Sequence, residues 1–562
     1  MKKFLQRLIP LMLSAVVMLT TVGCGGPEIV EQLDESKTTL KVYNYSGGVG
    51  TGWLTPIKES FEQKFANYSF EPGKKGVQIM PDETKTDTSL QTIQQNENHV
   101  FFAEWVDVVS LVGNDNTLNI HDVMTTPLNE YLVDETGKSV TDDTATIESK
   151  LYEESKDFFT FRDEQYYGLP HYSHFPAIIY NHQLFEDKGL FFADTPTGPA
   201  LEDNFVSGTN RTKSCGPDGK MGTNDDGLPA TWDEMFLLYD RMLQRSVIPF
   251  VWNGEGAKGY TKYFLSNAYL NLVGKDVARY NYDYDSGDNT INIITKFNED
   301  GTYETGTAKI SSEADKNLLH SELEKFYALE AFDKMLDNKD YYTENCQKGL
   351  GSNLDAQYDF ILSAGERKPI GMLLEGSYWY NEAEDAGHID AGRFSQDDFD
   401  DVNDFRIMYM PHQYKGRAAD IKGRDMGNFV LADQSDSFAC INKTIEGNDG
   451  LVKCAKMFLA FCYTQQSLED FTAISDTVRF MHYDVDTSKL SEYGKHIWNI
   501  VKEADVLLPY SRHNGYLQDK RKYTMHIEGT FFEYNATRPY DLLRGGTNTV
   551  VNYFKNYMAQ DK

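Results

Sequence analysis

The sequence predicts a mixed α/β protein built from two large lobes. Its 562 residues exceed what one ordinary hydrophobic core can hold, so two domains are expected. From residue 38 onward, short apolar runs alternate with longer runs of helical periodicity, which is the pattern of a sheet covered by helices. We find no internal repeat and no low-complexity tract, so a repeat architecture is excluded.

The N-terminus has the pattern of an exported protein. The cationic stretch MKKFLQR precedes the apolar run LIPLMLSAVVMLTTVG, which is short for a membrane-spanning helix and typical of a signal peptide. Cys24 follows Gly23 directly, and this junction resembles the lipobox of bacterial lipoproteins, although Thr21 stands where that family usually has Leu. The alternative is a cleaved signal peptide followed by an incidental cysteine.

This resemblance implies where the protein resides. Residues 1–23 would be removed as a signal peptide, and Cys24 would become the lipidated first residue of the mature chain. Residues 24–37 are polar and without clear periodicity, which predicts a flexible tether. The protein would then be lipid-anchored on the extracytoplasmic face of a bacterial cell membrane, and the anchor would be its contact with the bilayer.

The first folded segment is predicted to be a strand, a glycine-rich turn and a helix. Thr39 to Tyr45 form the strand, SGGVGT at 46–51 the turn, and the apolar residues from Trp53 to Phe65 recur with helical period. The turn lacks the spacings of nucleotide-binding loops. We therefore expect Gly48 to bring bare backbone close to a ligand's hydroxyl groups. Further short strands are expected at GVQIM and at 103–112.

The central part of the chain repeats this alternation. AIIYN at 177–181 and IPFVW at 248–252 predict strands, and a capping box of Thr231 and Glu234 predicts a helix start. Apolar periodicity predicts a long helix over 314–337, followed by a buried strand at 370–376. Further strand and helix patterns follow at 404–411, 449–469, 487–503 and 541–559.

Four of these segments, in order, resemble one family. YNYSGGVGTGWLTPIKESFEQKF, YYGLPHYSHFPAIIYNHQLF, PATWDEM and KPIGMLLEGSYW are similar to segments of the extracellular solute-binding proteins of ABC importers, carbohydrate-binding branch, which includes maltose-binding protein. The resemblance covers essentially residues 38–560. It implies a two-lobed periplasmic-binding-protein type II fold with hinge-crossing strands. The chain is longer than typical members, with extra segments near 195–230 and 277–311.

Carried onto this chain, the resemblance implies a division into lobes and a partner. The first lobe would hold 38–160 and 366–445, and the second 161–365 and 446–562. A carbohydrate, expected to be an oligosaccharide, would bind between them and pass to an ABC transporter permease. Open α/β sheets bind ligands beside the carboxyl ends of their strands, so the same cleft is expected on general grounds.

Aromatic side chains at strand ends are the first candidates for the ligand site. A sugar ring needs a flat apolar surface, and Trp379 follows a strand and the small turn Gly376–Ser377. Trp252 ends another strand, and Trp53 begins a helix. Tyr172 and His174 lie near the expected hinge. For each of these residues, packing in the core or at the hinge is the alternative.

Polar candidates are fewer. Arg479 and Arg512 are hypothetical clamps for sugar hydroxyl groups, with an ordinary surface position as the alternative. The stretch CGPDGKMGTNDDG places four oxygen-bearing side chains among glycines: Asp218, Asn224, Asp225 and Asp226. These could hold a structural Ca²⁺, although the spacing does not match an EF-hand loop, and a plain turn is the alternative. No other cofactor is required.

Composition narrows the function classes. The formal net charge of −32 excludes a general nucleic-acid-binding surface and is typical of a soluble acidic exterior. The chain lacks GxSxG and HExxH, and its His residues show no metal-ligand spacing, so we expect no enzyme. The open alternatives are a binding protein for a non-sugar solute such as a peptide, a non-transport lipoprotein, and a secreted glycan-active enzyme. A monomer without a disulfide framework is expected.

Overall fold

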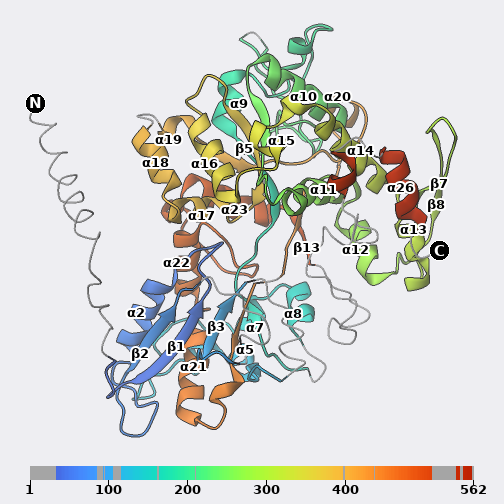
Figure 1. Ribbon diagram of the computed structural model, residues 1–562. Helices are drawn as coiled ribbons and strands as arrows, with labels where there is room; N and C mark the ends of the chain where they lie inside the picture. The colour runs from blue at the N-terminus through green and yellow to red at the C-terminus, as the bar shows by residue number, and fades with distance from the viewer. Residues whose placement is uncertain are drawn as a thin grey trace, which may run out of the picture.

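The computed structural model describes residues 33–84, 93, 95–104, 115–160, 164–208, 210–395, 399–435, 437–508, 539–544 and 549–559. The expected signal peptide, Cys24, most of the tether, most of the strand expected at 103–112, and Arg512 lie outside these residues. Two lobes, each with its own sheet, lie one above the other and are joined by several chain segments (Figure 1).

The first lobe contains a five-stranded sheet in the order β2-β1-β3-β12-β4. β1 is parallel to β2 and β3, and β12 is antiparallel to β3 and β4. Their bounds are β1 Thr38–Asn44, β2 Val77–Asp82, β3 Val100–Ala103, β4 Leu169–Pro170 and β12 Phe438–Ile441. β1 is buried at alternate residues and then continuously at its end, as expected of a strand between two layers of helices.

Helices from both ends of the chain cover this sheet. The ring of Phe61 in α2 (Leu54–Lys64) lies 5.2 Å from that of Phe458 in α21 (Asp449–Phe461), and α22 (Gln465–Ser475) also contacts α2. Shorter helices complete the lobe: α5 (His121–Thr125) and α6 (Leu128–Tyr131) pack on α21, and α7 (Ile147–Lys150) packs on α5. α8 (Glu153–Phe159) follows α7 in the chain.

The second lobe contains a four-stranded sheet in the order β10-β5-β9-β6. β9 is parallel to β6 and antiparallel to β5, and all of its residues are buried because helices cover both faces. The bounds are β5 Pro176–Asn181, β6 Ile248–Val251, β9 Ile370–Gly376 and β10 Phe405–Ile407. The principal helices are α9 His182–Lys188, α10 Trp232–Gln244, α11 Ala257–Val273, α14 Leu323–Asp337, α16 Asn353–Ser363, α17 Trp379–Asp385, α18 His388–Ser395 and α23 Glu492–Glu503.

The helix cap predicted at Thr231 is confirmed. The Thr231 side chain accepts a hydrogen bond from the Glu234 backbone N–H at 3.3 Å, so α10 begins there. The Glu234 carboxylate returns to the backbone N–H of Ala230 at 3.0 Å. These two bonds satisfy donors that a helix start would otherwise leave without partners.

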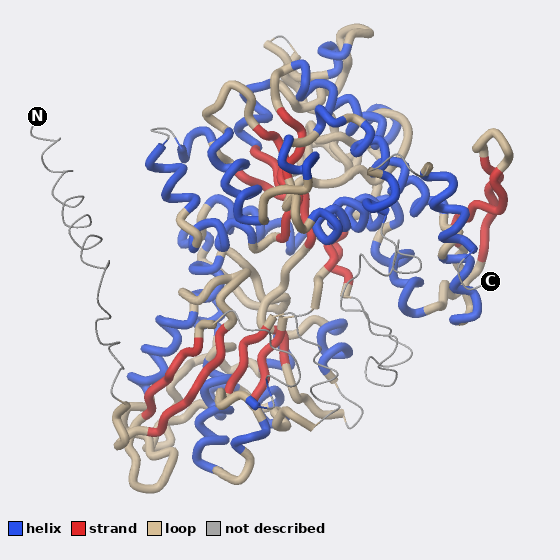
Figure 2. The backbone as a smooth tube through the Cα atoms, in the orientation of Figure 1, coloured by secondary structure: helices blue, strands red, loops and turns tan. Residues whose placement is uncertain are grey.

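Three chain segments cross between the lobes, at 171–175, 433–437 and 476–484 (Figure 2). The Ser173 N–H donates to the Val478 carbonyl at 2.9 Å, and the Ser173 hydroxyl donates to Asp433 at 2.5 Å. Two short strands, β11 (Val430–Ala432) and β13 (Asp505–Leu507), pair beside them. Hydrogen bonds therefore hold the three crossings together as one hinge.

The observed sheets change the predicted lobe boundaries. β9 and β10, which the sequence assigned to the first lobe with 366–445, pair in the second sheet. β4 joins the first sheet, and α21 and α22, assigned to the second lobe with 446–562, pack on the first. The chain recrosses near 433 rather than near 366. A fully buried strand such as β9 has the same apolar pattern whichever sheet it joins, so the pattern did not reveal its partners.

The two segments that make this chain longer than typical family members, 195–230 and 277–311, both belong to the second lobe. The segment at 195–230 is mostly loop with one short 3-10 helix, η1 (Leu201–Asn204). The segment at 277–311 contains the end of α12 (Lys275–Asp283) and a hairpin of β7 (Ile291–Phe297) and β8 (Tyr303–Ala308), which projects from the lobe (Figure 2). Helices α13 (Lys316–Leu319), α14 and α26 (Val550–Ala559) pack against the hairpin, and α25 (Pro539–Leu543) packs on α26.

A buried ion pair lies in this part of the second lobe. The ammonium of Lys325 is 3.9 Å from the carboxylate of Glu322, and both residues are fully buried. Lys325 also donates to the side-chain oxygen of Asn281 at 2.7 Å, and the Tyr269 hydroxyl donates to Glu322 at 2.7 Å. Burial is the main cause that raises the pKa of Glu322 to about 7 and lowers that of Lys325 to about 8. The pair connects α14 to α11 and α12.

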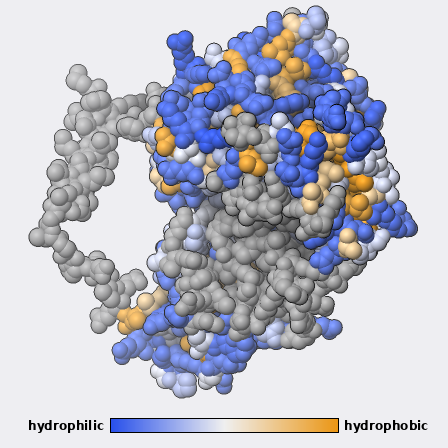
Figure 3. All heavy atoms as spheres, turned by 45° about the vertical axis from the view of Figure 1, so that its right-hand side comes forward, coloured by the Kyte–Doolittle hydropathy of each residue, from blue (hydrophilic) through white to orange (hydrophobic). Residues whose placement is uncertain are grey.

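The surface and the cysteines match two expectations from the sequence, a polar exterior and the lack of a disulfide framework among the described residues. The face drawn in Figure 3 is mostly hydrophilic, with apolar groups in small clusters. Within the described part of the chain, the five cysteines at 215, 346, 440, 454 and 462 are free and buried. None of the described helices combines the length and apolar character needed to cross a membrane.

Candidate ligand-binding site

The glycine-rich turn after β1 is the first part of the candidate site. Gly48 and Gly50 have φ angles of 49° and 69°, in the left-handed region that favours glycine. A Cβ atom placed on Gly48 would lie 2.5 Å from the Tyr172 hydroxyl and 2.8 Å from a carboxylate oxygen of Glu104. Glu104 directly follows β3, so the ends of two parallel strands and the first crossing segment meet at this glycine.

The second lobe touches this turn directly. The Asn381 side chain, on α17, donates to the Gly48 carbonyl at 3.4 Å. A Cβ atom on Gly50 would lie 2.7 Å from the same amide nitrogen, and it would also meet Asp385. Because α17 follows the end of β9, the strand ends of the two sheets face one another here. This is where α/β folds bind ligands.

We expect Gly48→Ala to disturb this contact between the lobes. The new methyl group would collide with the buried Tyr172 hydroxyl in addition to straining the backbone. Gly73→Ala is a matched control, because Gly73 also has a positive φ of 82° but has nothing within 4 Å of its Cβ position. Small-angle scattering and ligand calorimetry should show a larger radius and weaker binding for Gly48→Ala alone. Equal behaviour of the two variants would contradict a role for Gly48 at the lobe contact.

A cluster of polar side chains lies at the end of β9. Gln357, on α16, donates to Glu375 at 3.2 Å and to Glu382 at 2.9 Å, and Asn353 donates to Glu382 at 3.1 Å. Glu375 also accepts from the backbone N–H of Gly376 at 2.8 Å. Burial first, and the neighbouring Glu382 second, raise the pKa of Glu375 well above its usual range.

Aromatic side chains connect this cluster to the hinge. His174 lies between Tyr172 and Tyr378, with ring centroids 5.5 Å and 5.4 Å away. Burial first raises the pKa of Tyr378 well above its usual value, and Tyr263, Tyr260, Glu375 and Glu382 add to it. Three predicted residues, Gly48, Tyr172 and His174, thus lie together between the lobes.

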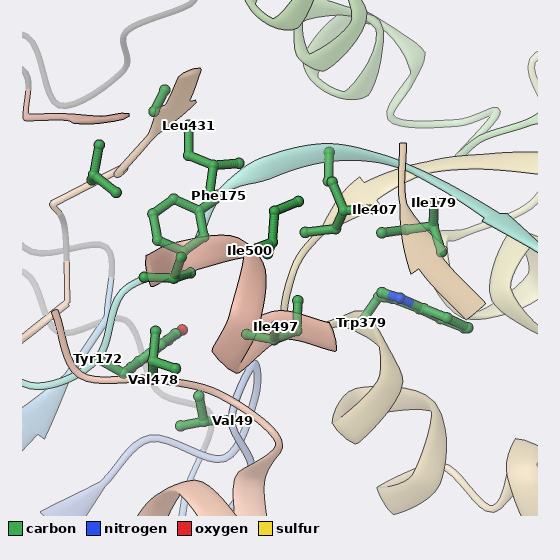
Figure 4. Packing of buried hydrophobic residues seen from close by; sticks show 14 of the residues in the cluster. Val49, Tyr172, Phe175, Ile179, Trp379, Ile407, Leu431, Val478, Ile497 and Ile500 are labelled. Atoms are coloured by element: carbon green, nitrogen blue, oxygen red, sulfur yellow. The ribbon is translucent and has the colours of Figure 1, made fainter. Parts of the chain in front are cut away.

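Trp379 does not lie at the ligand site. Its side chain is fully buried, and its ring lies 5.2 Å from Phe405, 5.8 Å from Phe360 and 5.9 Å from Tyr493. Figure 4 shows the indole among apolar side chains of the second lobe, on the side of Ile179. The stacking prediction is wrong because α17 begins at Trp379 and turns this side chain into the core. Its neighbour Tyr378 belongs to the polar cluster instead.

The other two predicted tryptophans are also core residues. Trp252 is 1% exposed and packs on Tyr342 at 4.8 Å. Trp53 is fully buried, with Phe102 at 4.9 Å and Phe471 at 5.3 Å. Neither indole face is open to a sugar, so both assignments are corrected.

Arg479 is a buried residue of the first lobe. It is 1% exposed, and its guanidinium lies 4.3 Å from the ring centroids of Tyr463 and Phe471. It donates to the Cys462 carbonyl at 2.6 Å. These contacts hold the side chain inside the first lobe, but Arg479 also lines a cavity beside the third crossing segment, and two of its nitrogens have no hydrogen-bond partner among the described residues, so the clamp role stays a prediction.

The predicted calcium residues form a hydrogen-bonded turn. The Asp225 carboxylate accepts from the Asp218 backbone N–H at 2.8 Å and from the Thr223 hydroxyl at 2.7 Å. Asp226 accepts from the Gly222 backbone N–H at 2.8 Å. These carboxylates therefore stabilise the loop that leads into α10.

The fourth predicted ligand points to another element. The Asn224 amide donates to Glu503, at the end of α23, at 3.1 Å. Burial raises the pKa of Asp225 to about 7. Within the described part of the chain, no three His, Cys, Asp or Glu side chains are grouped so as to hold a metal ion. Calcium binding by this loop stays a prediction that chelation can test.

We expect chelation to leave the stability unchanged. The loop's own donors already bind the carboxylates of Asp225 and Asp226, so the folded state does not need an ion there. Melting curves recorded with a chelator and with excess Ca²⁺ should overlay. A higher melting temperature with Ca²⁺, lost in an Asp225→Asn variant, would establish the metal site, since a ligand of the native state stabilises it by mass action.

A cavity of about 740 Å³ lies beside the third crossing segment. Lys150 and Tyr152 of the first lobe line it, together with Trp498 and Lys502 of the second. Tyr152 stacks on Phe480 of the crossing with ring centroids 4.2 Å apart. Residues of both lobes line this cavity, as they do the contact at the glycine turn. Its shape therefore depends on the relative orientation of the two lobes.

Several residues of the site were missed in the sequence. Glu104, Asn381, Glu375 and Gln357 were not singled out. Glu375 stands near the carboxyl end of the strand predicted at 370–376, whereas Glu104 lay near the start of the strand predicted at 103–112 and follows the observed β3, which ends at Ala103. A position at the carboxyl end of a strand is a usable signal, because parallel strand ends converge at one edge of a sheet. Gln357 and Asn381 are helical residues whose proximity arises from tertiary packing, and the sequence carried no signal for them.

Comparisons with known proteins identify the fold. No family model matches the sequence, and no curated protein matches it. Among solved structures, a "Chitin oligosaccharide binding protein" has a TM-score of 0.52 at 14% identity, covering 93% of this chain and 98% of the other.

Two further structures match equally along their length. The SBP RafE of Streptococcus pneumoniae, in complex with raffinose, has a TM-score of 0.52 at 13% identity and covers 93% and 99% of the two chains. The GacH receptor of Streptomyces glaucescens, a structure also determined with acarbose, has a TM-score of 0.50 at 10% identity and covers 93% and 97%. The predicted two-lobed fold is confirmed, and the titles of these structures name binding proteins and a receptor.

Proposed function

We propose that the chain is the substrate-binding component of an ABC importer and captures an oligosaccharide between its two lobes. Support comes from the fold, which it shares with proteins whose titles name chitin oligosaccharides, raffinose and acarbose as their ligands. In this role the protein binds without catalysing a reaction and delivers its ligand to a membrane permease.

One observation carries the proposal. The turn at Gly48 in the first lobe touches Asn381 in the second, at the strand ends of both sheets, while three hydrogen-bonded crossings join the lobes behind them. A ligand seated between such surfaces contacts both lobes only when they are close together. Binding energy is therefore converted into lobe closure, which a permease can recognise.

The residues around this contact suit a carbohydrate. Carboxylate and amide groups of Glu104, Asn381 and Glu382 can accept from or donate to hydroxyl groups. Tyr172 and Tyr378 are buried at this contact, at 2% and 7% exposure, and separation of the lobes would present their rings and hydroxyl groups to a ligand. We assign the ligand site to these five residues.

The lipid anchor is a separate part of the proposal. It rests on the signal sequence and on Cys24, and it places the protein as a monomer on the extracytoplasmic face of a bacterial membrane. Cys24→Ala is expected to release the protein from the membrane or to leave it unprocessed, as measured by detergent partitioning. Normal maturation and membrane retention of that variant would contradict the anchor.

A glycan screen tests the function. Thermal shift across neutral oligosaccharides should raise the melting temperature for one ligand class, and scattering should show compaction with the same ligand. Product analysis in the same samples should find the glycan intact. Stabilisation by peptides alone would favour the non-sugar alternative, and cleaved glycan would favour an enzyme.

A further inference from the structure

Two acidic side chains share one amide at the end of β9. Glu375 is 1% exposed, and its hydrogen-bond donors are the Gln357 side chain and the Gly376 backbone. The same Gln357 nitrogen also donates to Glu382. Gln357 is fully buried, and its side-chain oxygen has no hydrogen-bond partner among the described residues. The carboxyl groups are thus held together by neutral donors.

Such a pair retains negative charge in a poorly hydrated place. Burial, followed by Glu382, raises the pKa of Glu375, because two nearby carboxylates cannot both ionise at low cost. Holding two carboxyl groups together in a buried place therefore costs free energy, which a nearby cation would offset. A cation brought beside the pair would be attracted, and an anion would be repelled more strongly than in water.

Tyrosines surround this pair. The rings of Tyr260 and Tyr263, on α11, lie 5.4 Å apart at 51°. Tyr378 follows Gly376 at the end of β9, with its ring 5.4 Å from that of His174, and both tyrosines and both glutamates contribute to its raised pKa. Aromatic faces next to carboxylates are the surroundings in which proteins bind ammonium groups.

The first lobe adds acidic groups from the other side. Glu104 lies against Gly48 and Tyr172. Burial raises the pKa of Glu83, which follows β2, and Asp385 of α17 raises it further across the lobe contact. Lys58 is the cation that lowers it. Closing the lobes therefore brings negative charge together from both sides.

We propose that this acidic group selects the ligand by charge: a glycan bearing a protonated amine is bound in preference to a neutral glycan of the same size, and a uronate is rejected. This inference rests on the proposed function and names the substrate class. Glu375 and Glu382 are its specificity-determining residues, and the ammonium of the sugar lies between them and the tyrosines.

Calorimetry with three matched oligomers tests the proposal. β-1,4-linked tetrasaccharides of glucosamine, glucose and glucuronic acid share length and linkage; near pH 6 each ring carries an ammonium at C2, no charge, or a carboxylate at C6. The amine should bind at least about tenfold more tightly than the neutral oligomer, and the uronate at least about tenfold more weakly. A uronate that binds as tightly as the neutral oligomer overturns the inference.

Variants on α17 provide the control. Glu382→Gln should bring the affinity for the amine close to that for the neutral oligomer, while Glu384→Gln, an exposed carboxylate on the same helix, should preserve the order. If Glu382→Gln does not fold, the affinities of the wild-type protein are measured at several salt concentrations instead. Its preference for the amine over the neutral oligomer should decrease as the salt concentration rises. A preference insensitive to salt contradicts charge selection.

The outcomes also distinguish failure of charge selection from failure of the proposed carbohydrate-binding function. If the three glycans bind with equal affinity, the protein is a carbohydrate-binding protein and charge selection is wrong. If none of the three binds and a peptide panel does, the proposed function fails, and this inference fails with it.

Discussion

Trp379→Ala is expected to lower the free energy of unfolding by about 3–5 kcal/mol, the cost of truncating a large buried aromatic side chain. The indole is fully buried and packs edge-on against Phe405 and Tyr493. Removing it leaves a cavity between α17, β10 and α23. Denaturant melts should show a large shift of the midpoint with little change in slope.

A surface residue of the same lobe provides the control. Tyr358, on α16, is 41% exposed, so Tyr358→Ala should change the free energy of unfolding by only about 0.5 kcal/mol. Glycan affinity of Trp379→Ala, measured where it remains folded, should be close to that of the wild type. A variant that keeps its stability and loses the glycan would restore Trp379 as a stacking surface.

Lys325→Met is expected to be destabilising to a similar degree, by about 3–5 kcal/mol. The change leaves the Glu322 carboxylate fully buried without its counter-ion, and the Tyr269 hydroxyl alone cannot balance a charge. Replacing both partners, as in Glu322→Gln with Lys325→Met, should recover much of the loss, because no charge is then left uncompensated. Lys334→Met, an exposed position on the same helix, should have a small effect.

The pH dependence of Lys325→Met gives a second measurement. Burial already raises the pKa of Glu322 to about 7, and losing the cation raises it further. A carboxyl group with a raised pKa binds more protons in the folded state than in the unfolded state, so stability increases as pH falls. The variant should therefore be closer to wild type at pH 5 than at pH 8. A loss that does not depend on pH would mean that packing, rather than charge, is responsible.

The local structure was largely predictable from sequence. The alternation of strand and helix, the cap at Thr231 and the close approach at Gly48 follow from periodicity and from the conformational preferences of single residues. These signals are local. The resemblance to solute-binding proteins, rather than any local signal, placed Tyr172 and His174 near the hinge, where their rings lie 5.5 Å apart.

The ligand site was only partly predictable. Tyr378 and Trp379 are adjacent in the sequence, and which one faces the other lobe depends on where α17 begins. Core and cleft aromatics both follow strand ends, so composition did not separate them. Gln357 joins Glu375 and Glu382 through packing of α16 on β9, which no sequence pattern records.

The order in which the lobes can be completed follows from their strands. The second lobe draws β5, β6, β9 and β10 from residues 176–407, whereas the first lobe cannot complete its five-stranded sheet until β12, at 438–441, has been made. Contacts that span so much chain form slowly. During synthesis the lobe that begins the chain is therefore the last to complete its sheet: β1, β2 and β3 can pair with one another, but the other side of β3 waits for β12. A strand edge left open in this way favours aggregation while it lasts.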